Sequence, residues 1–204
     1  IQAGTAPTES GERDEYSNGN GSLMRILPLA FYVKNRDTSA RFSHIEEVSG
    51  ITHAHMRSKI ACSIYIEMAL HLLDGKAMKE AYDTMKPVIV EHYFPMQREA
   101  EWAHFERILN GDLQELERNE VKSSGYVIDT LEASLWCLLT TDCFQDAVLT
   151  AVNLGEDTDT VGAVTGGLAG LYYGMANIPA EWLQVLARRE DIEELSERLA
   201  KSLM

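Results

Sequence analysis

The fold is decided by residues 155–174, which read GEDTDTVGAVTGGLAGLYYG, a polar turn followed by a helix of mostly small residues. Four glycines, Gly162, Gly166, Gly170 and Gly174, recur at every fourth position and form a bare ridge along one helix face. Because each interior glycine costs a helix about 1 kcal/mol relative to alanine, close approach of another backbone must offset that loss. The stretch therefore predicts tight helix–helix packing in the core, which holds the polar turn rigidly.

Helical periodicity extends from this stretch along the rest of the chain. We expect a first helix from Ser22, with a start or bend at Pro28, and a second helix that Ser49 or Thr52 caps and Gly75 ends. Further helices are predicted over residues 76–92, from Pro95 to 110, over 129–140, 144–153 and 160–175, from Pro179, and over 190–203.

No alternating apolar pattern is longer than about four residues, so the fold class is all-α. We divide the chain into a loop or disordered lead-in at residues 1–21 and a single all-helical domain at residues 22–204. The first residue is Ile1 rather than methionine, so we expect a fragment or a processed chain.

Composition agrees with one globular domain: 204 residues, of which 45% are hydrophobic and 25% charged. A net charge of −14 repels phosphate backbones and argues against a nucleic-acid partner. We interpret the apolar residues 161–178 as a buried helix, so no membrane partner is expected. The chain has an odd number of cysteines, and each lies in or beside an apolar run: Cys62, Cys137 and Cys143. This pattern predicts buried free thiols, and free thiols indicate a reducing, cytoplasmic location.

The strongest chemical signal is Asp157-Thr158-Asp159-Thr160. In a turn, two carboxylates two residues apart can converge beside the Thr160 hydroxyl, and such oxygen ligands suit magnesium or calcium. The same residues begin a predicted helix, so Asp157 or Asp159 could equally be a helix cap. The spacing of an EF-hand is absent, because no acidic residue closes a twelve-residue loop.

A second candidate is the glycine-rich turn at residues 18–22, Asn-Gly-Asn-Gly-Ser, which precedes a predicted helix. Exposed backbone N–H groups beside a helix start suit a phosphate or pyrophosphate, and the Ser22 hydroxyl could touch that phosphate or cap the helix. An ordinary turn explains the same residues, since no Walker lysine follows them.

Two further candidates are the histidines of Thr52-His53-Ala54-His55 and the aromatic ring in Ser123-Ser124-Gly125-Tyr126. Residues two apart near a helix start diverge, so we expect His53 to face the site and His55 to face away. His53 could also be a satisfied polar residue without a ligand. Tyr126 could pack on a base or sugar, or could simply be a core tyrosine behind a loop.

Taken together in order, four segments resemble the motifs of the ADP-ribosylglycohydrolase family. They are NGNGSLMRILPLA at 18–30, ITHAH at 51–55, GYVIDTLEA at 125–133 and AVNLGEDTDTVGA at 151–163. The resemblance covers nearly the whole chain. It implies a compact multi-helix hydrolase that releases ADP-ribose from a modified protein or small molecule, by attack of a metal-activated water on the anomeric carbon.

The resemblance also implies roles for particular residues. The ligands of Mg²⁺, of which the complete enzyme holds two ions, would include Asp157, Asp159 and Thr160. The residues that cradle the diphosphate and distal ribose would be Gly19, Asn20, Gly21 and Ser22. His53 would bind the diphosphate and Tyr126 would line the nucleotide pocket.

The chain departs from the family pattern in two places. Glu156 stands where many members carry a second glycine. The family's amino-terminal Thr-Asp-Asp motif, which supplies further metal ligands, is absent, and the nearest string, Thr141-Asp142-Cys143, is in the wrong place. We therefore expect the domain to be incomplete, to need an amino-terminal segment of the same protein, and to be inactive alone. The alternative is a non-catalytic relative that binds ADP-ribose or a nucleotide, or has a structural role.

Overall fold

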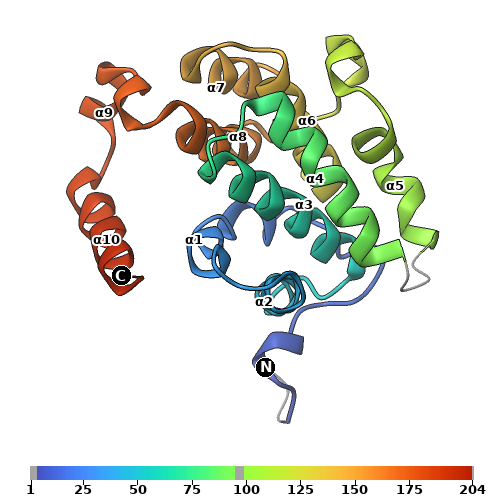
Figure 1. The fold of residues 1–204 in the computed structure, drawn as a ribbon. Helices are drawn as coiled ribbons and strands as arrows, with labels where there is room; N and C mark the ends of the chain where they lie inside the picture. The colour runs from blue at the N-terminus through green and yellow to red at the C-terminus, as the bar shows by residue number, and fades with distance from the viewer. Residues whose placement is uncertain (1–3, 95–98, 204) are drawn as a thin grey trace.

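A computed structural model describes residues 4–94 and 99–203, and within these ranges all regular structure is helical (Figure 1). The α-helices are α1 (Leu29–Val33), α2 (Thr38–Gly50), α3 (Met56–Leu73), α4 (Met78–Tyr93), α5 (Glu99–Asn110), α6 (Val127–Leu139), α7 (Phe144–Val152), α8 (Thr158–Tyr173), α9 (Ala180–Val185) and α10 (Arg189–Ser202). Short 3-10 helices are η1 (Pro7–Glu9), η2 (Leu23–Arg25), η4 (Leu113–Glu115), η5 (Arg118–Glu120) and η6 (Met175–Asn177). The predicted all-α class is confirmed.

Helix α3 lies at the centre of the domain, with α1, α2, α4, α6 and α8 packed around it (Figure 1). It is apolar on nearly all sides, so almost every residue from Arg57 to Leu72 is buried. A second buried helix, α6, packs between α3 and the α7–α8 pair. The loops that precede α3, α6 and α8 are therefore attached to rigid, buried elements.

The first half of the glycine ridge on α8 packs as predicted. A Cβ on Gly162 would lie 2.8 Å from Val152 of α7, and one on Gly166 would lie 3.6 Å from Val148. The prediction is wrong for Gly170, which faces open space, and for Gly174, which ends the helix with φ of +79°. The close approach continues instead at Gly167, outside the ridge, where a Cβ would meet Leu27 and Tyr65 at 2.7 Å.

Several local expectations need correction. Helix α2 was not expected; Asp37 caps it by accepting a hydrogen bond from the Ala40 amide at 2.9 Å. Helix α3 is capped by His55, rather than by Ser49 or Thr52, because the His55 imidazole accepts from the Arg57 amide. Pro28 does precede a helix, as the N-cap of α1, whereas Pro95 lies outside the described residues.

The lead-in makes contacts with the domain, and one cysteine differs from expectation. Residues 4–21 contain η1, which contacts α2, and they bury Asn18 and Asn20. Cys62 and Cys137 are buried thiols, but Cys143 is exposed because its sulfur caps α7, accepting from the Asp146 amide at 3.4 Å.

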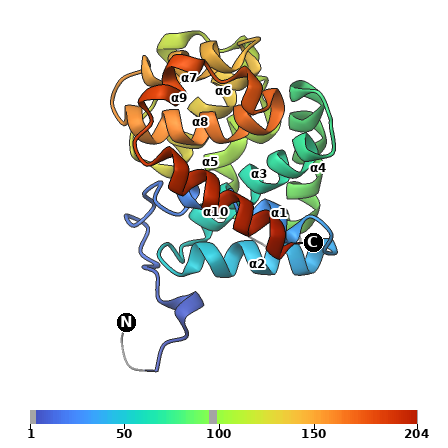
Figure 2. The same cartoon turned by 90° about the vertical axis from the view of Figure 1, so that its left-hand side faces the viewer.

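The carboxy-terminal helices α9 and α10 lie along the outside of the domain (Figures 1 and 2). Neither contains a buried residue. Among the described helices, including α8 with its apolar run, none is long and apolar enough to cross a bilayer.

Candidate functional site

Three loops from distant parts of the sequence meet beside the start of α8. The Asn20 side-chain amide donates to Asp157 Oδ2 at 2.6 Å and to Thr130 Oγ1 at 2.9 Å. Asn20 and Thr130 are buried, so their hydrogen bond lies in a low-dielectric setting, whereas Asp157 is only partly buried. The expected proximity of the glycine loop and the aspartate turn is confirmed.

Backbone pairing holds the loops in register. Gly19 and Tyr126 form an isolated antiparallel bridge, in which the Asn20 amide donates to Gly125 O at 3.1 Å and the Val127 amide donates to Asn18 O at 3.0 Å. The Asp157 amide donates to Ser123 O at 3.1 Å. Gly125 lies close to the aspartate turn, because a Cβ there would be 3.3 Å from Asp157 Oδ2 and would require a small shift of that side chain.

The aspartate turn presents oxygen atoms rather than a helix cap. Asp157 occupies the N-cap position of α8, but its side chain makes no capping hydrogen bond. The hydrogen bond from Asn20 is the main cause that lowers the pKa of Asp157, with Thr160 and Asp159 acting in the same direction and partial burial opposing them. Asp159 is exposed and Thr160 is buried. The charged form of Asp157 is thus favoured where a cation would bind.

Glu156 is part of the same turn and has an unusual backbone. Its φ is +52°, in the left-handed region that costs a side-chain-bearing residue about 1 kcal/mol or more. The preceding Gly155 has φ of +96°, which glycine adopts without strain. The Glu156 side chain is exposed.

The His53 ring lies against the glycine loop. A Cβ on Gly21 would lie 2.9 Å from His53 Cε1, and one on Gly19 would lie 3.6 Å from its Nε2. A larger residue at position 21 would displace the imidazole, so the observed position of the His53 ring requires glycine there. His55 instead caps α3, so the two histidines make different contacts.

A cavity of about 420 Å³ adjoins the loops, and its lining residues come from three segments. They are Glu15, Tyr16, Asn18, Gly19, Arg57, Gly125 and Tyr126. The half-buried Tyr126 ring lies 5.9 Å from the guanidinium of Arg57, which is itself 5% exposed and paired with Glu101 at 2.8 Å. The sequence points to Tyr126 but not to Arg57 or to Tyr16, a cavity-lining residue that is 95% exposed.

Comparison with known proteins shows to which family the chain belongs. The ADP-ribosylglycohydrolase family profile matches residues 1–204. The chain belongs to the ADP-ribosylglycohydrolase family.

Individual relatives agree with this assignment. ADP-ribosylarginine hydrolase Tri1 of Serratia proteamaculans is 34% identical over 93% of this chain and 48% of its own length. The ADP-ribosyl-[dinitrogen reductase] glycohydrolase of Rhodospirillum rubrum is 31% identical, over 93% of this chain and 56% of its own. A solved ADP-ribosylglycohydrolase-related protein complex superposes with a TM-score of 0.77 and 32% identity, over 94% of this chain and 63% of that one. The chain spans about half the length of the curated relatives it matches.

The donor atoms of this ADP-ribosylglycohydrolase chain fit part of a magnesium site. Asp157, Asp159 and Thr160 offer hard oxygen ligands, and one carboxylate oxygen of Asp157 is already oriented by Asn20. Within residues 4–94 and 99–203, no group of three acidic, histidine or cysteine residues could hold a metal ion. The described residues therefore fit as a fraction of an octahedral shell, not as a complete one.

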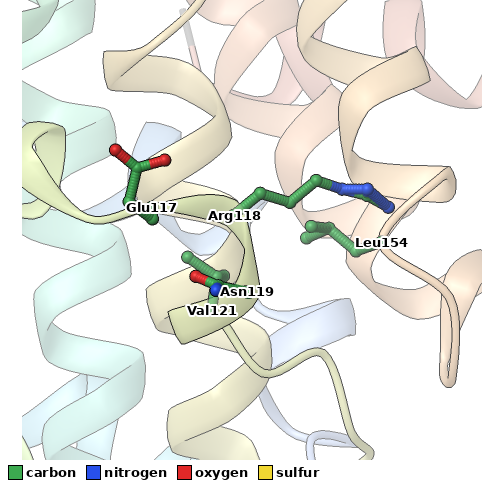
Figure 3. A pocket seen from close by; sticks show the side chains of 5 residues that line it. All are labelled: Glu117, Arg118, Asn119, Val121 and Leu154. Atoms are coloured by element: carbon green, nitrogen blue, oxygen red, sulfur yellow. The ribbon is translucent and has the colours of Figure 1, made fainter.

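Two features lie apart from this site. The Ser22 side chain is fully buried and accepts a hydrogen bond from Cys62 Sγ at 3.5 Å, so it faces the core and does not cap a helix. A separate hollow of about 500 Å³ is lined by residues of η5 and by Leu154, and Arg118 reaches across it (Figure 3). It contains none of the predicted site residues.

Proposed function

We propose that this chain carries the ADP-ribose-binding part of an enzyme that hydrolyses the glycosidic bond between ADP-ribose and a modified target. The observation that carries the proposal is the hydrogen bond from Asn20 to Asp157, which joins the glycine loop to the aspartate turn beside the cavity at Tyr126. A nucleotide-sized ligand in that cavity would place its phosphates along the glycine loop. The target is an ADP-ribosylated protein or small molecule.

The chain's own residues divide the binding of ADP-ribose between them. Tyr126 offers an aromatic face and the Arg57 guanidinium flanks it. Gly19 and Gly21 allow close approach of backbone to phosphate, and His53 lies on the same loop surface. Asn20 holds the Asp157 carboxylate at a set position relative to the ligand.

Asp157, Asp159 and Thr160 would hold magnesium, which when bound supplies positive charge and an orienting point for ribose hydroxyls. In the reaction, the oxygen of water forms a bond to the anomeric carbon of the ribose while the bond to the target breaks. One proton of the water ends on the target and the other stays on the new ribose hydroxyl. Asn20, through its hydrogen bonds to Thr130 and Asp157, keeps this surface rigid during that exchange.

We also propose that these 204 residues alone bind two magnesium ions weakly and hydrolyse substrate slowly. Two carboxylates and one hydroxyl provide too little fixed charge and too few ligands for two octahedral ions. Additional ligands from an amino-terminal segment of the same protein would complete the site. A cytoplasmic location accords with the free thiols Cys62 and Cys137.

The test measures release of free ADP-ribose from ADP-ribosylarginine, for this chain and for the longer gene product that contains it. Asp157→Asn in the longer protein should lower kcat/KM by at least about a hundredfold, because it removes a charge next to the reacting bond. The matched control, Asp191→Asn on α10, should change it less than twofold. Equal activity in the Asp157 variant and the parent would refute the assigned site.

A second candidate function is binding of ADP-ribose without catalysis. It is favoured by the lack, within the described residues, of three clustered metal-ligating side chains. Calorimetry distinguishes the two: a pure binding protein would take up ADP-ribose with an affinity that magnesium does not change. Neither the short nor the longer protein would then release ADP-ribose from substrate.

A further inference from the structure

The surroundings of His53 contain a chain of hydrogen bonds that begins on another element. The Nη2 atom of Arg25 donates to Thr52 Oγ1 at 2.7 Å and to Val48 O at 2.9 Å. These two hydrogen bonds anchor the guanidinium at the end of α2. Thr52 Oγ1 in turn lies 2.9 Å from His53 Nδ1. The three side chains therefore form a continuous path from η2 to the imidazole.

Chemistry sets the direction of the first hydrogen bond: an arginine can only donate, so the Thr52 oxygen accepts from Arg25. The Thr52 hydroxyl keeps its proton and a second lone pair, so the contact with His53 Nδ1 can run in either direction. Donation from Arg25 polarises the hydroxyl and strengthens it as a donor toward Nδ1. In that arrangement Nδ1 accepts, and the single proton of the neutral imidazole lies on Nε2. That nitrogen lies on the side of the glycine loop, 3.6 Å from where a Cβ of Gly19 would be.

The charges around the imidazole keep it neutral. Burial is the first cause that lowers the pKa of His53, and the positive charge of Arg25 is the second. Glu12, whose backbone pairs with that of His53, opposes them by raising the pKa. The balance favours a neutral ring at neutral pH. A neutral ring has a single N–H, so its chemistry depends on which nitrogen carries that proton.

We propose that Arg25 and Thr52 are positioning residues that hold His53 as the neutral Nε2–H tautomer, with its donor presented to the glycine loop. The ligand group that this donor suits is a phosphate oxygen of a nucleoside diphosphate, which accepts hydrogen bonds. The assignment of a phosphate oxygen as the ligand rests on the proposed function, whereas the assignment of the tautomer does not. Arg25 acts through Thr52 in this proposal, since its Nη2 donates to Thr52 and Val48.

The test uses the ¹⁵N NMR resonances of histidine in the 204-residue chain, with His53 assigned by its loss in His53→Asn. The wild type should show a protonated Nε2 and an Nδ1 that accepts a hydrogen bond. Thr52→Val has the same shape but no hydroxyl, so the Nδ1 resonance should shift, while Thr52→Ser should restore it. Both substitutions are at an exposed position and preserve the fold. A proton on Nδ1 in the wild type, or a Thr52→Val spectrum identical to the wild type, would overturn the proposal.

Two further measurements complete the test. Arg25→Gln should raise the pKa of His53, whereas Arg36→Gln, an exposed arginine on Tyr32, should leave it unchanged. Thr52→Val should weaken ADP-ribose binding about tenfold, the loss expected of one misplaced donor. Unchanged affinity together with a shifted Nδ1 resonance would refute the positioning role. If the predicted tautomer is present but the wild type binds no ADP-ribose, the proposed function fails and the tautomer assignment stands.

Discussion

Residues 18–22 contain almost no regular structure, yet they bury Asn18, Asn20 and Ser22, whereas the fourteen-residue helix α10 buries nothing. The glycine loop is held by partners more than a hundred positions away, Thr130 and Asp157. The ion pairs of helix α10, such as Arg189 with Glu193, join residues of the helix to each other. Regular secondary structure is therefore a poor guide to rigidity here, because long-range contacts decide which segment is fixed.

The largest expected difference is between the buried helix α8 and the exposed helix α10, and truncation of one leucine in each helix measures it. Leu168 of α8 is fully buried, and Leu168→Ala should lower the free energy of unfolding by about 3 kcal/mol through lost burial and a cavity. Leu195 of α10 is 63% exposed, so Leu195→Ala should change it by less than about 0.5 kcal/mol. Urea denaturation measures both, and similar losses would show that α10 is packed after all.

A smaller effect is expected from removing one amide side chain. Asn20→Ala should lower the free energy of unfolding by about 2 kcal/mol, because Asp157 loses its donor in a partly buried setting. The control is Asn177→Ala near the carboxy terminus, where the exposed side chain bonds only to Tyr173 O and water can replace it. If both variants unfold at the same denaturant concentration, the long-range contact does not stabilise the loop.

Relief of backbone strain should raise the free energy of unfolding in each region, but by different amounts. Glu156→Gly replaces a residue at φ of +52° and should raise the free energy of unfolding by about 0.5 kcal/mol, after the entropy of glycine in the unfolded chain is subtracted. Arg188, at the start of α10, has φ of +57° but also pairs with Asp191. Arg188→Gly should therefore gain less, and a larger gain there would contradict the argument.

The smallest expected effect concerns pH. The pKa of His53 is lowered in the folded state, mainly by burial, so the unfolded chain takes up the proton first. The stability that this histidine contributes is present above its unfolded pKa of about 6.5 and is lost as pH falls through the folded value. Between about pH 7.5 and about pH 5.5, His53→Asn should lose less stability than the wild type.

His71 provides a check on that expectation, because its pKa is also lowered, first by burial and then by Lys76. A His53→Asn, His71→Asn double variant should have a flatter pH dependence than either single variant. Histidine does not occur in residues 179–204, so shortening that segment should leave the slope unchanged. An unchanged slope in His53→Asn would show that its surroundings do not disfavour the charged ring.

The sequence by itself determined the all-α class, most helix positions and the meeting of the glycine loop with the aspartate turn. The class and the helix positions succeed because apolar periodicity and glycine or proline signals act over one or two helical turns. The meeting of the two loops followed instead from the family resemblance of the four ordered motifs. The sequence missed α2, in which only Phe42, Ile45 and Val48 supply large apolar side chains. It also assigned the cap of α3 to the wrong residue, since several polar residues precede that helix and any of them could accept the hydrogen bond.

Only the tertiary structure decided which side chains of each motif face the cavity. Ser22 follows directly on the glycine loop, yet its hydroxyl points to Cys62 in the core. Tyr16 and Arg57 line the cavity although neither belongs to an expected ligand motif. The physical reason is that the cavity is formed where loops separated by more than a hundred residues pack together, and sequence spacing carries no direct information on such contacts.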